Sequence, residues 1–595
     1  MKQFLKQVLA TVVGISLWML AAILICVVSI IGMALSDSST KAVKRGSVMR
    51  ITLSGVLDER AQEADLMSII LGGETGGLGL DELLAGIDAA AKNDNVEGIY
   101  LEVGNFDGGT PALMQELRQA LVQYKKDSGK WIVAYGDMYT QGAYYLCSVA
   151  DRVMLNPEGM VDWHGLASQP MFYTDLLKKV GVKFQVFKVG KFKSAVEPYI
   201  ATEMSEPNRQ QVDSFLRSIW GQMLAEVGES RNLTAEQLNQ LADTMTAMQP
   251  ASLLLVHHMV DTLTYIDGVR DALRTRLNVA EGKKLPFVSP ADVIAAAKTK
   301  SYDDKIAVYY ASGEIVQLAA QDLMLQGETI AQDATVRELR KLRSDKSVKA
   351  VVLRVNSPGG SAYASEQIWR ELQLLKAEKP VVVSMAGMAA SGGYYISCGA
   401  SKILAEPMTL TGSIGIFGLI PDASELLTEK LELHFDVVKT NAHSDFGAMG
   451  RPFNDSESAM MQAYVERGYD LFTRRVAEGR GLPQDSVDAI GQGRVWTGEQ
   501  ALKIGLVDQL GDLNAAIAEA AKLAKLTDYE RVNYPEQVPW FEQMMHENQE
   551  SYFDARMHQA LSSLSPAIDL LKILQQQRTP QQCVLARMPF ELNLY

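Results

Sequence analysis

The stretch ADRVMLNPEGMVDWHGL, residues 150–166, aligns without a gap with ASKILAEPMTLTGSIGI, residues 400–416, at an offset of 250. MYTQGAYYL (138–146) matches MAASGGYYI (388–396) at the same offset, and the strand-like runs that open each copy match at an offset of 258. Ordered matches over more than a hundred residues indicate a tandem duplication. We therefore expect two domains of one fold, at residues 47–300 and 301–530 of this 595-residue chain.

Each copy alternates short apolar runs with stretches of helical periodicity. In the second copy AVVLRVN (350–356) and VVVSM (381–385) are typical of buried strands, and residues 361–380 between them have helical spacing. A helix is expected to begin near Ser391, and residues 464–482 predict an amphipathic helix that closes at Gly481. Strands that alternate with helices predict βαβ units and a largely parallel sheet, so the fold class is α/β.

The N-terminus predicts a membrane anchor within residues 1–46. Residues 8–35 form a run of 28 residues without a charge. As a helix this run is about 42 Å long, enough to cross a hydrocarbon core of ~30 Å with tilt. Its length exceeds that of a signal-peptide core and no A-x-A site closes it, so we expect an uncleaved single span. The folded body all follows the span, and we expect the N-terminus inside and the body outside.

Composition excludes several classes of function. The net charge of −14 argues against a nucleic-acid partner, which requires a basic footprint. The four cysteines are scattered without a CxxC pair, and they indicate buried small side chains rather than a metal site or disulfide framework. We expect no metal and no cofactor. Residues 531–595 are rich in Gln and Met, and their role is not assigned.

Ser391 is the candidate nucleophile, because it follows a buried strand and stands between small residues and two glycines. Its counterpart in the first copy is Gln141, which cannot act as a nucleophile. The first copy instead offers Lys193, in VGKFKSAVEP, whose counterpart in the second copy is His443. A Ser–Lys dyad divided between the two copies needs no histidine.

Lysine is a general base only when it is neutral, so the pKa of Lys193 must fall from about 10.4 towards 7–8. Burial in a cleft between the domains, or the positive charges of Lys188 and Lys191, could lower it. Other interpretations stay open. Ser391 could simply cap a helix that begins at Gly392, and Lys193 could be a solvated surface residue. His443 is a rival base, with Ser444 and Asp445 beside it.

An acyl-transfer site also needs hydrogen-bond donors for the oxyanion. Gly359 and Gly360 follow a strand end, where amides without a Cβ can approach a ligand closely. The amide of Gly392, beside the candidate nucleophile at the start of a helix, is a natural second donor.

The sequence resembles the signal peptide peptidase SppA (protease IV) family, in the long form of Gram-negative bacteria. The resemblance rests on the anchor, the duplication and the motifs GKFKSAVEPY, NSPGGSAYASE, GMAASGGYYIS, LTGSIGIFG and GRVWTGEQALKIGLVDQLG. It implies a Clp-protease/crotonase-like fold and a membrane-anchored serine protease, with Ser391 similar to the family nucleophile and Lys193 to the general base. Ser413 resembles the hydroxyl that orients the lysine, and Gly359, Gly360 and Gly392 resemble the oxyanion turn.

The resemblance further implies a homotetramer on the periplasmic side of the bacterial cytoplasmic membrane, with its N-terminus in the cytoplasm. Its substrates would be the hydrophobic signal peptides that precursor processing leaves in the membrane lipid. Two alternatives belong to other classes. One is a crotonase-like acyl-CoA enzyme, which would need neither Ser391 nor Lys193. The other is a catalytically silent membrane scaffold, which the loss of the nucleophile at Gln141 makes conceivable.

Overall fold

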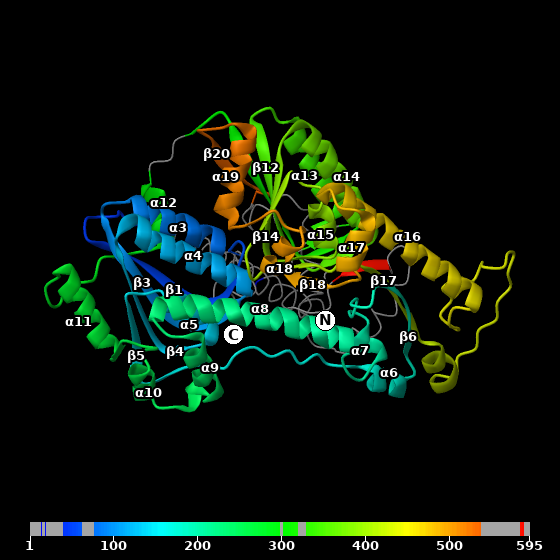
Figure 1. Ribbon diagram of the computed structural model, residues 1–595, viewed down its shortest axis with the longest axis horizontal. Helices are drawn as coiled ribbons and strands as arrows, with labels where there is room; N and C mark the ends of the chain where they lie inside the picture. Colours follow the sequence, from blue (N-terminus) through cyan, green and yellow to red (C-terminus); the bar gives the residue numbers. More distant parts are fainter. Residues whose placement is uncertain are drawn as a thin grey trace, which may run out of the picture.

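The computed structural model describes residues 14, 18, 40–61, 77–297, 301–318, 329–536 and 584–587. These residues form two α/β units side by side, the first in blue to green and the second in green to orange (Figure 1). Within the described residues no helix is both long and apolar enough to span a membrane. The predicted anchor at residues 8–35 lies outside them, apart from Gly14 and Trp18.

The first unit is built on a seven-stranded sheet with the order β2-β1-β3-β4-β5-β7, in which β8 also pairs with β1. Every pairing in this sheet is parallel. Its strands are β1 (Ser47–Asp58), β2 (Leu78–Gly79), β3 (Val96–Gly109), β4 (Trp131–Tyr139), β5 (Arg152–Val161), β7 (Thr262–Leu263) and β8 (Phe287–Val288). The helices α3 (Leu80–Lys92), α4 (Pro111–Ser128) and α5 (Gln141–Cys147) alternate with the main strands, as βαβ units require.

The second unit is built on an eight-stranded sheet with the order β18-β16-β14-β12-β9-β20, in which β15 pairs with β14 and β19. Its strands are β9 (Lys305–Ser312), β12 (Val348–Ser357), β14 (Val381–Ala390), β15 (Lys402–Ala405), β16 (Leu410–Gly412), β18 (Val495–Thr497), β19 (Gln509–Leu510) and β20 (Glu530–Tyr534). All ten residues of β14 are buried, as expected for a central strand covered on both faces. The strand β20 crosses the boundary that the sequence placed at residue 530.

A third sheet joins the two units, and it positions the site. Its order is β11-β10-β13-β21-β17-β6, with β10 (Glu314–Val316), β11 (Thr329–Ala331), β13 (Gly359–Ser361), β17 (Ile416–Asp422) and β21 (Val584–Arg587). The remaining strand, β6 (Lys183–Val189), belongs to the first copy and pairs antiparallel with β17 of the second along its whole length. The first copy therefore sends one strand into the second unit.

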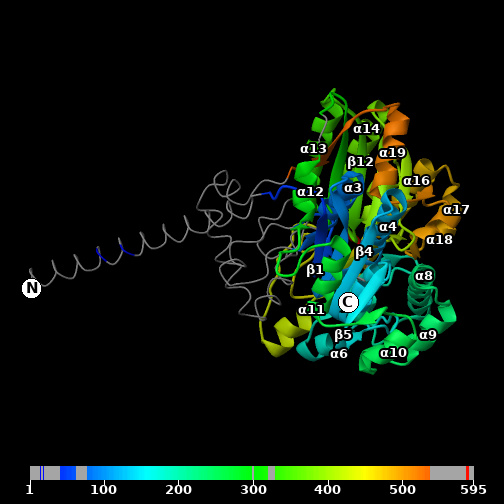
Figure 2. The ribbon, with the colours of Figure 1, turned by 90° about the vertical axis from the view of Figure 1, so that its left-hand side faces the viewer.

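The remaining helices cover the sheets or bridge the units. They are α6 (Thr174–Val180), α7 (Glu197–Ile200), α8 (Glu206–Arg231), α9 (Ala235–Asp243), α10 (Ala251–Val256), α11 (Ile266–Leu277), α12 (Pro290–Ala296), α13 (Gln332–Ser344), α14 (Ala362–Glu378), α15 (Gly392–Ser397), α16 (Asp455–Arg480), α17 (Gln484–Ile490), α18 (Gly498–Lys503) and α19 (Leu513–Ala524). The helix α8 runs beneath both units (Figure 1), and in the view of Figure 2 it lies with α9 and α10 at one side of the body.

A buried ion cluster also joins the two copies. Arg354, on β12 and 1% exposed, lies 2.8 Å from Glu59 of the first copy and also pairs with Glu116 on α4. Its guanidinium donates a further hydrogen bond of 2.8 Å to Ser384 Oγ. A buried cation is tolerated only when its partners satisfy it, so this cluster holds the two repeats in one relative position.

Candidate active site

The turn after β14 presents Ser391 in a strained conformation. The strand ends at Ala390, and Ser391 has φ 55° and ψ −112°, which a non-glycine residue rarely adopts. Its N–H donates to Gly412 O at 2.8 Å, and this bond fixes the turn against β16. Ser391 precedes α15, but its side chain makes no capping hydrogen bond. The interpretation of Ser391 as a side-chain helix cap is therefore wrong, and its buried Oγ is available to contact another group.

Lys193 reaches the second unit because β6 delivers it there. The strand pairs Val189 with Ile416 at the start of β17, and the chain then turns at Gly190, with φ 101°. Lys193 packs against Gly493, where an added Cβ would lie only 2.6 Å from the lysine backbone N. The side chain is 0% exposed. The solvated-surface interpretation of Lys193 is therefore wrong.

The two predicted residues meet. Lys193 Nζ lies 2.7 Å from Ser391 Oγ, 3.0 Å from Ser413 Oγ and 3.1 Å from the carbonyl oxygen of Ser413. A neutral amine has two N–H donors and one lone pair. The Ser413 carbonyl can only accept, so it takes one N–H, and Ser413 Oγ can accept the other. The lone pair is then left for the Ser391 hydroxyl, which is the arrangement a general base requires.

Burial lowers the pKa of Lys193 from 10.5 to about 7. The cause is the loss of water around the ammonium form, because the group is fully enclosed by protein. Lys188 and Lys191 are not the cause, which corrects the expectation that their charges contribute. A base with a pKa near neutrality is half unprotonated at pH 7 and can accept a proton there.

Ser413 is held as firmly as the lysine that it contacts. It has φ 49°, and its N–H donates to Arg494 O at 2.8 Å. The sequence pointed to this residue only through the resemblance, since its spacing carries no signal of its own. With both its hydroxyl and its carbonyl directed at Nζ, Ser413 is suited to orient the amine.

The three glycines predicted to stabilise an oxyanion lie near one another but are not equivalent. β13, which contains Gly359 and Gly360, packs against α15, which begins at Gly392. The Gly359 N–H donates to Ser357 Oγ at 3.1 Å, so that amide already has a partner. Gly360 has φ 152°, and a Cβ there would meet Ile315 O at 2.1 Å, so only glycine fits. Of the three, Gly360 and Gly392 are the better candidates for the two donors.

The strand β21 is a feature of the site that the sequence did not predict. It lies between β13 and β17 and is antiparallel to both, with Gly360 paired to Ala586 and Phe417 paired to Leu585. β17 begins three residues after Ser413. An extended segment from the C-terminal region thus occupies the space between strands that lead into the dyad. No motif in residues 531–595 signalled this pairing.

The corresponding place in the first copy is closed by its own side chain. The Gln141 amide oxygen accepts hydrogen bonds from the N–H groups of His164 and Gly165, at 3.0 and 2.9 Å, and its amide nitrogen donates to Gly165 O. His164 and Gly165 are the repeat counterparts of Ile414 and Gly415, next to Ser413. The Gln141 amide therefore forms hydrogen bonds with the backbone of the turn that corresponds to the Ser413 turn of the second copy. No nucleophilic side chain stands at the position of Ser391.

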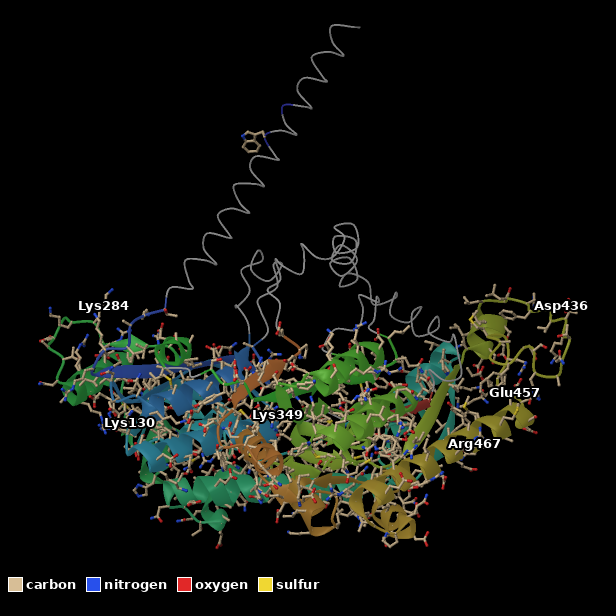
Figure 3. All side chains as sticks on the ribbon, turned by 90° about the horizontal axis from the view of Figure 1, so that it is seen from above. Lys130, Lys284, Lys349, Asp436, Glu457 and Arg467 are labelled. Atoms are coloured by element: carbon tan, nitrogen blue, oxygen red, sulfur yellow. The ribbon has the colours of Figure 1, made fainter. Side chains whose placement is uncertain are left out.

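The rival base lies elsewhere. His443 belongs to the segment between η2 (Leu426–Lys430) and α16, its side chain is 40% exposed, and its Nδ1 lies 4.0 Å from Glu457 Oε1. Figure 3 shows this segment projecting at one end of the molecule, with Asp436 near its tip and Glu457 nearer the body. Asp445 pairs with Lys439 and Arg451 rather than with a histidine. Within the described part of the chain, no group of acidic, His and Cys side chains could hold a metal ion.

Comparison with known proteins agrees with this geometry. The family model described as "Peptidase family S49" matches residues 124–280 and 373–527, one range in each copy, and the model described as "Clp protease" matches residues 314–409. Protease 4 of Salmonella typhi is 36% identical over 551 residues, which cover 89% of this chain and 87% of that protein. Protease 4 of Haemophilus influenzae is 34% identical and covers 83% and 82% of the two chains. The chloroplastic serine protease SPPA of Arabidopsis thaliana is 31% identical and covers 81% and 70%.

Proposed function

The chain belongs to peptidase family S49 and is a serine peptidase. From this premise we propose that Ser391 and Lys193 form its catalytic dyad, and that the protein is a membrane-anchored endopeptidase that degrades cleaved signal peptides. The observation that carries the dyad is the 2.7 Å contact between Lys193 Nζ and Ser391 Oγ, two side chains that are both fully buried. The complete contact in the second copy argues against the silent-scaffold alternative. An acyl-CoA enzyme would have no use for this pair.

In the proposed reaction Ser391 Oγ attacks the carbonyl carbon of the scissile peptide bond while Lys193 Nζ takes the hydroxyl proton. The oxygen of the tetrahedral intermediate accepts hydrogen bonds from the amides of Gly360 and Gly392. Collapse of the intermediate breaks the C–N bond, and the ammonium of Lys193 gives its proton to the leaving amine. Lys193 then activates a water that hydrolyses the acyl-enzyme ester and restores Ser391. Ser413 holds Nζ in place through both half-reactions.

The pairing of β21 supports a substrate bound as an extended strand. The edges of β13 and β17 offer backbone hydrogen bonds to an extended segment on both sides. Recognition through the backbone fixes the position of the chain and leaves few requirements on its sequence. This is the binding mode that a peptidase acting on many hydrophobic segments needs.

The membrane location is proposed from the sequence and the family resemblance. The uncharged run at residues 8–35 has the length of a spanning helix. An anchor there would place the body on the periplasmic side of the cytoplasmic membrane, where signal peptides remain after processing. One curated relative is named a putative signal peptide peptidase SppA, from Enterococcus faecium, and is 38% identical over 205 residues. A homotetramer is likewise proposed from the family resemblance alone.

The test is cleavage of a synthetic signal peptide by the full chain in detergent, followed by mass spectrometry of the products. Wild type should cut within the hydrophobic core of the peptide. Ser391→Ala should leave less than about 1% of the activity, since loss of a nucleophile removes the covalent route. Ser444→Ala, which removes an exposed serine hydroxyl, is the matched control and should remain active. Equal cleavage by Ser391→Ala would contradict the proposal.

A further inference from the structure

The loop that carries Lys193 is held on one side by a buried side chain that the reaction itself does not use. Gln211 lies in the first turns of α8 and is 0% exposed. Its Nε2 lies 3.0 Å from the Phe192 carbonyl oxygen and 3.0 Å from Ser194 Oγ. These are the residues immediately before and after Lys193. One amide group therefore holds both neighbours of the general base.

The other end of the same amide bonds to the second copy. Gln211 Oε1 accepts a hydrogen bond of 3.2 Å from the N–H of Val495, the first residue of β18. The three residues before Val495 bond to the rest of the site. Gln492 O accepts from Phe192 N at 2.9 Å, Gly493 N donates to Ile414 O at 2.8 Å, and Arg494 O accepts from Ser413 N at 2.8 Å.

The segment 492–495 thus connects the loop that carries Lys193 to the turn that carries Ser413 through backbone hydrogen bonds. Gln211 adds a side-chain link between the same segment and the Lys193 loop. The two N–H donors of Nε2 are shared among three acceptors, because Asn208 Oδ1 also lies 3.1 Å away, and Asn208 Nδ2 in turn donates to Glu197 at 2.9 Å. Glu197 belongs to the same KSAVEP motif as Lys193. Ser194, Glu197, Asn208 and Gln211 are all buried, so none can exchange its partner for bulk water without cost.

We propose that Gln211 is a positioning residue, which holds Lys193 in register with Ser391 and keeps its amine sealed from water. The proposal rests on the function proposed above, since it assigns Gln211 a role in the dyad of that reaction. Without the amide, the carbonyl of Phe192 and the N–H of Val495 are both left unpaired in the interior. Water must enter to satisfy them, and water near Nζ reverses the desolvation that makes the lysine a base at neutral pH.

Few charges surround this loop. Lys191 Nζ lies over the Phe192 ring at 5.2 Å, and the Arg494 guanidinium lies over the same ring at 5.0 Å. Glu197 is engaged by Ser205 and Asn208. Burial is the cause of the lowered pKa of Lys193, so a change in its hydration is the route by which Gln211 acts on its titration.

The experiment compares Gln211→Leu with Gln222→Leu in the full chain. Gln222 lies three turns further along α8 and also bonds across the repeats, through a 3.1 Å contact between its Nε2 and Glu499 Oε2, but it does not touch the lysine loop. The readout is the pH dependence of kcat/KM for a synthetic signal peptide. In Gln211→Leu, kcat/KM at pH 7 should fall at least tenfold. The acid limb, which is the fall of kcat/KM at low pH, should move to higher pH by one unit or more. Gln222→Leu should keep the limb of wild type.

A second variant covers the case in which Gln211→Leu does not fold. Gln211→Glu keeps the shape and the acceptor for Val495 N; when ionised it has no donor for the Phe192 carbonyl, and its negative charge also favours the ammonium form of Lys193. It should therefore also move the acid limb upward. Unchanged limbs in both Gln211→Leu and Gln211→Glu would overturn the positioning role. If wild type itself neither cleaves the peptide nor shows an acid limb, the proposed function fails instead, and the two failures are distinguishable.

Discussion

Replacing Lys193 with methionine should abolish activity and at the same time stabilise the fold in a pH-dependent way. The folded-state pKa of Lys193 is about 7, against 10.5 for the same group in the unfolded chain. Between these values the unfolded chain binds a proton that the folded chain does not, so the stability of wild type rises with pH through this window. Methionine does not titrate, so the stability of the variant lacks this pH-dependent contribution. The advantage of the variant should therefore be largest at and below pH 7 and disappear above 10.5.

The two pKa values set the size of the effect. Keeping the amine unprotonated costs about 4 kcal/mol at pH 7, about 3 kcal/mol at pH 8 and about 1 kcal/mol at pH 10. The hydrogen bonds that methionine loses to Ser391 and Ser413 offset part of this at every pH, at roughly 1 kcal/mol each. That offset does not change with pH. The quantity to test is consequently the change, about 2–3 kcal/mol between pH 8 and pH 10.

Equilibrium urea unfolding, followed by tryptophan fluorescence at both pH values, measures this change. The free energy of unfolding of Lys193→Met relative to wild type should fall by about 2–3 kcal/mol as the pH rises from 8 to 10. Lys191→Met removes an exposed lysine two residues away and is the control, with a difference that stays nearly constant. A constant difference for Lys193→Met would refute the lowered pKa, and with it the explanation of how this lysine serves as a base.

Three further outcomes follow from the structure. Ser413→Ala should reduce kcat/KM about tenfold, because one hydrogen bond of about 1.4 kcal/mol to the amine is lost while the backbone carbonyl remains, and steady-state kinetics beside Lys193→Ala would show whether the loss is this partial. Arg354→Leu should lower the free energy of unfolding by about 3–5 kcal/mol, since two buried carboxylates lose their cation; an unchanged urea midpoint would contradict this. Ala586→Pro removes a backbone donor from β21 and should raise kcat/KM, because the proposed extended substrate would take the place of that strand between β13 and β17, whereas Ala586→Val keeps the donor and should behave as wild type.

Much of the site was predictable because the chain carries two copies of one fold. Ser391 stood out by its place after a buried strand and between small residues, and comparison of the copies then showed Gln141 in its place in the first copy and Lys193 opposite His443. The contact between them depends on β6 crossing from the first copy to pair with β17 of the second copy, in the sheet that joins the two units. No local pattern in residues 183–189 shows that pairing, so the sequence could predict a divided dyad but not the strand that assembles it.

The parts that could not be predicted depend on long-range contacts. Gln211 stands in an ordinary amphipathic helix, and only its contacts with Phe192 and Val495 distinguish it from other polar residues on α8. The strand β21 pairs with β13 from more than 200 residues away in the chain. The cause of the lowered pKa of Lys193 was predicted in part, since burial was expected and the contribution of neighbouring lysines was wrong.

The most direct test of the divided dyad is the pH dependence of Ser391 labelling by a fluorophosphonate probe, which reports acylation without a peptide substrate. Wild type should label with an acid limb centred near pH 7 and a tenfold fall for each pH unit below it. Lys193→Ala should lose nearly all labelling, while His443→Ala should keep both the rate and the limb. Labelling that survives in Lys193→Ala but is lost in His443→Ala would show that the second copy works alone and would contradict the dyad.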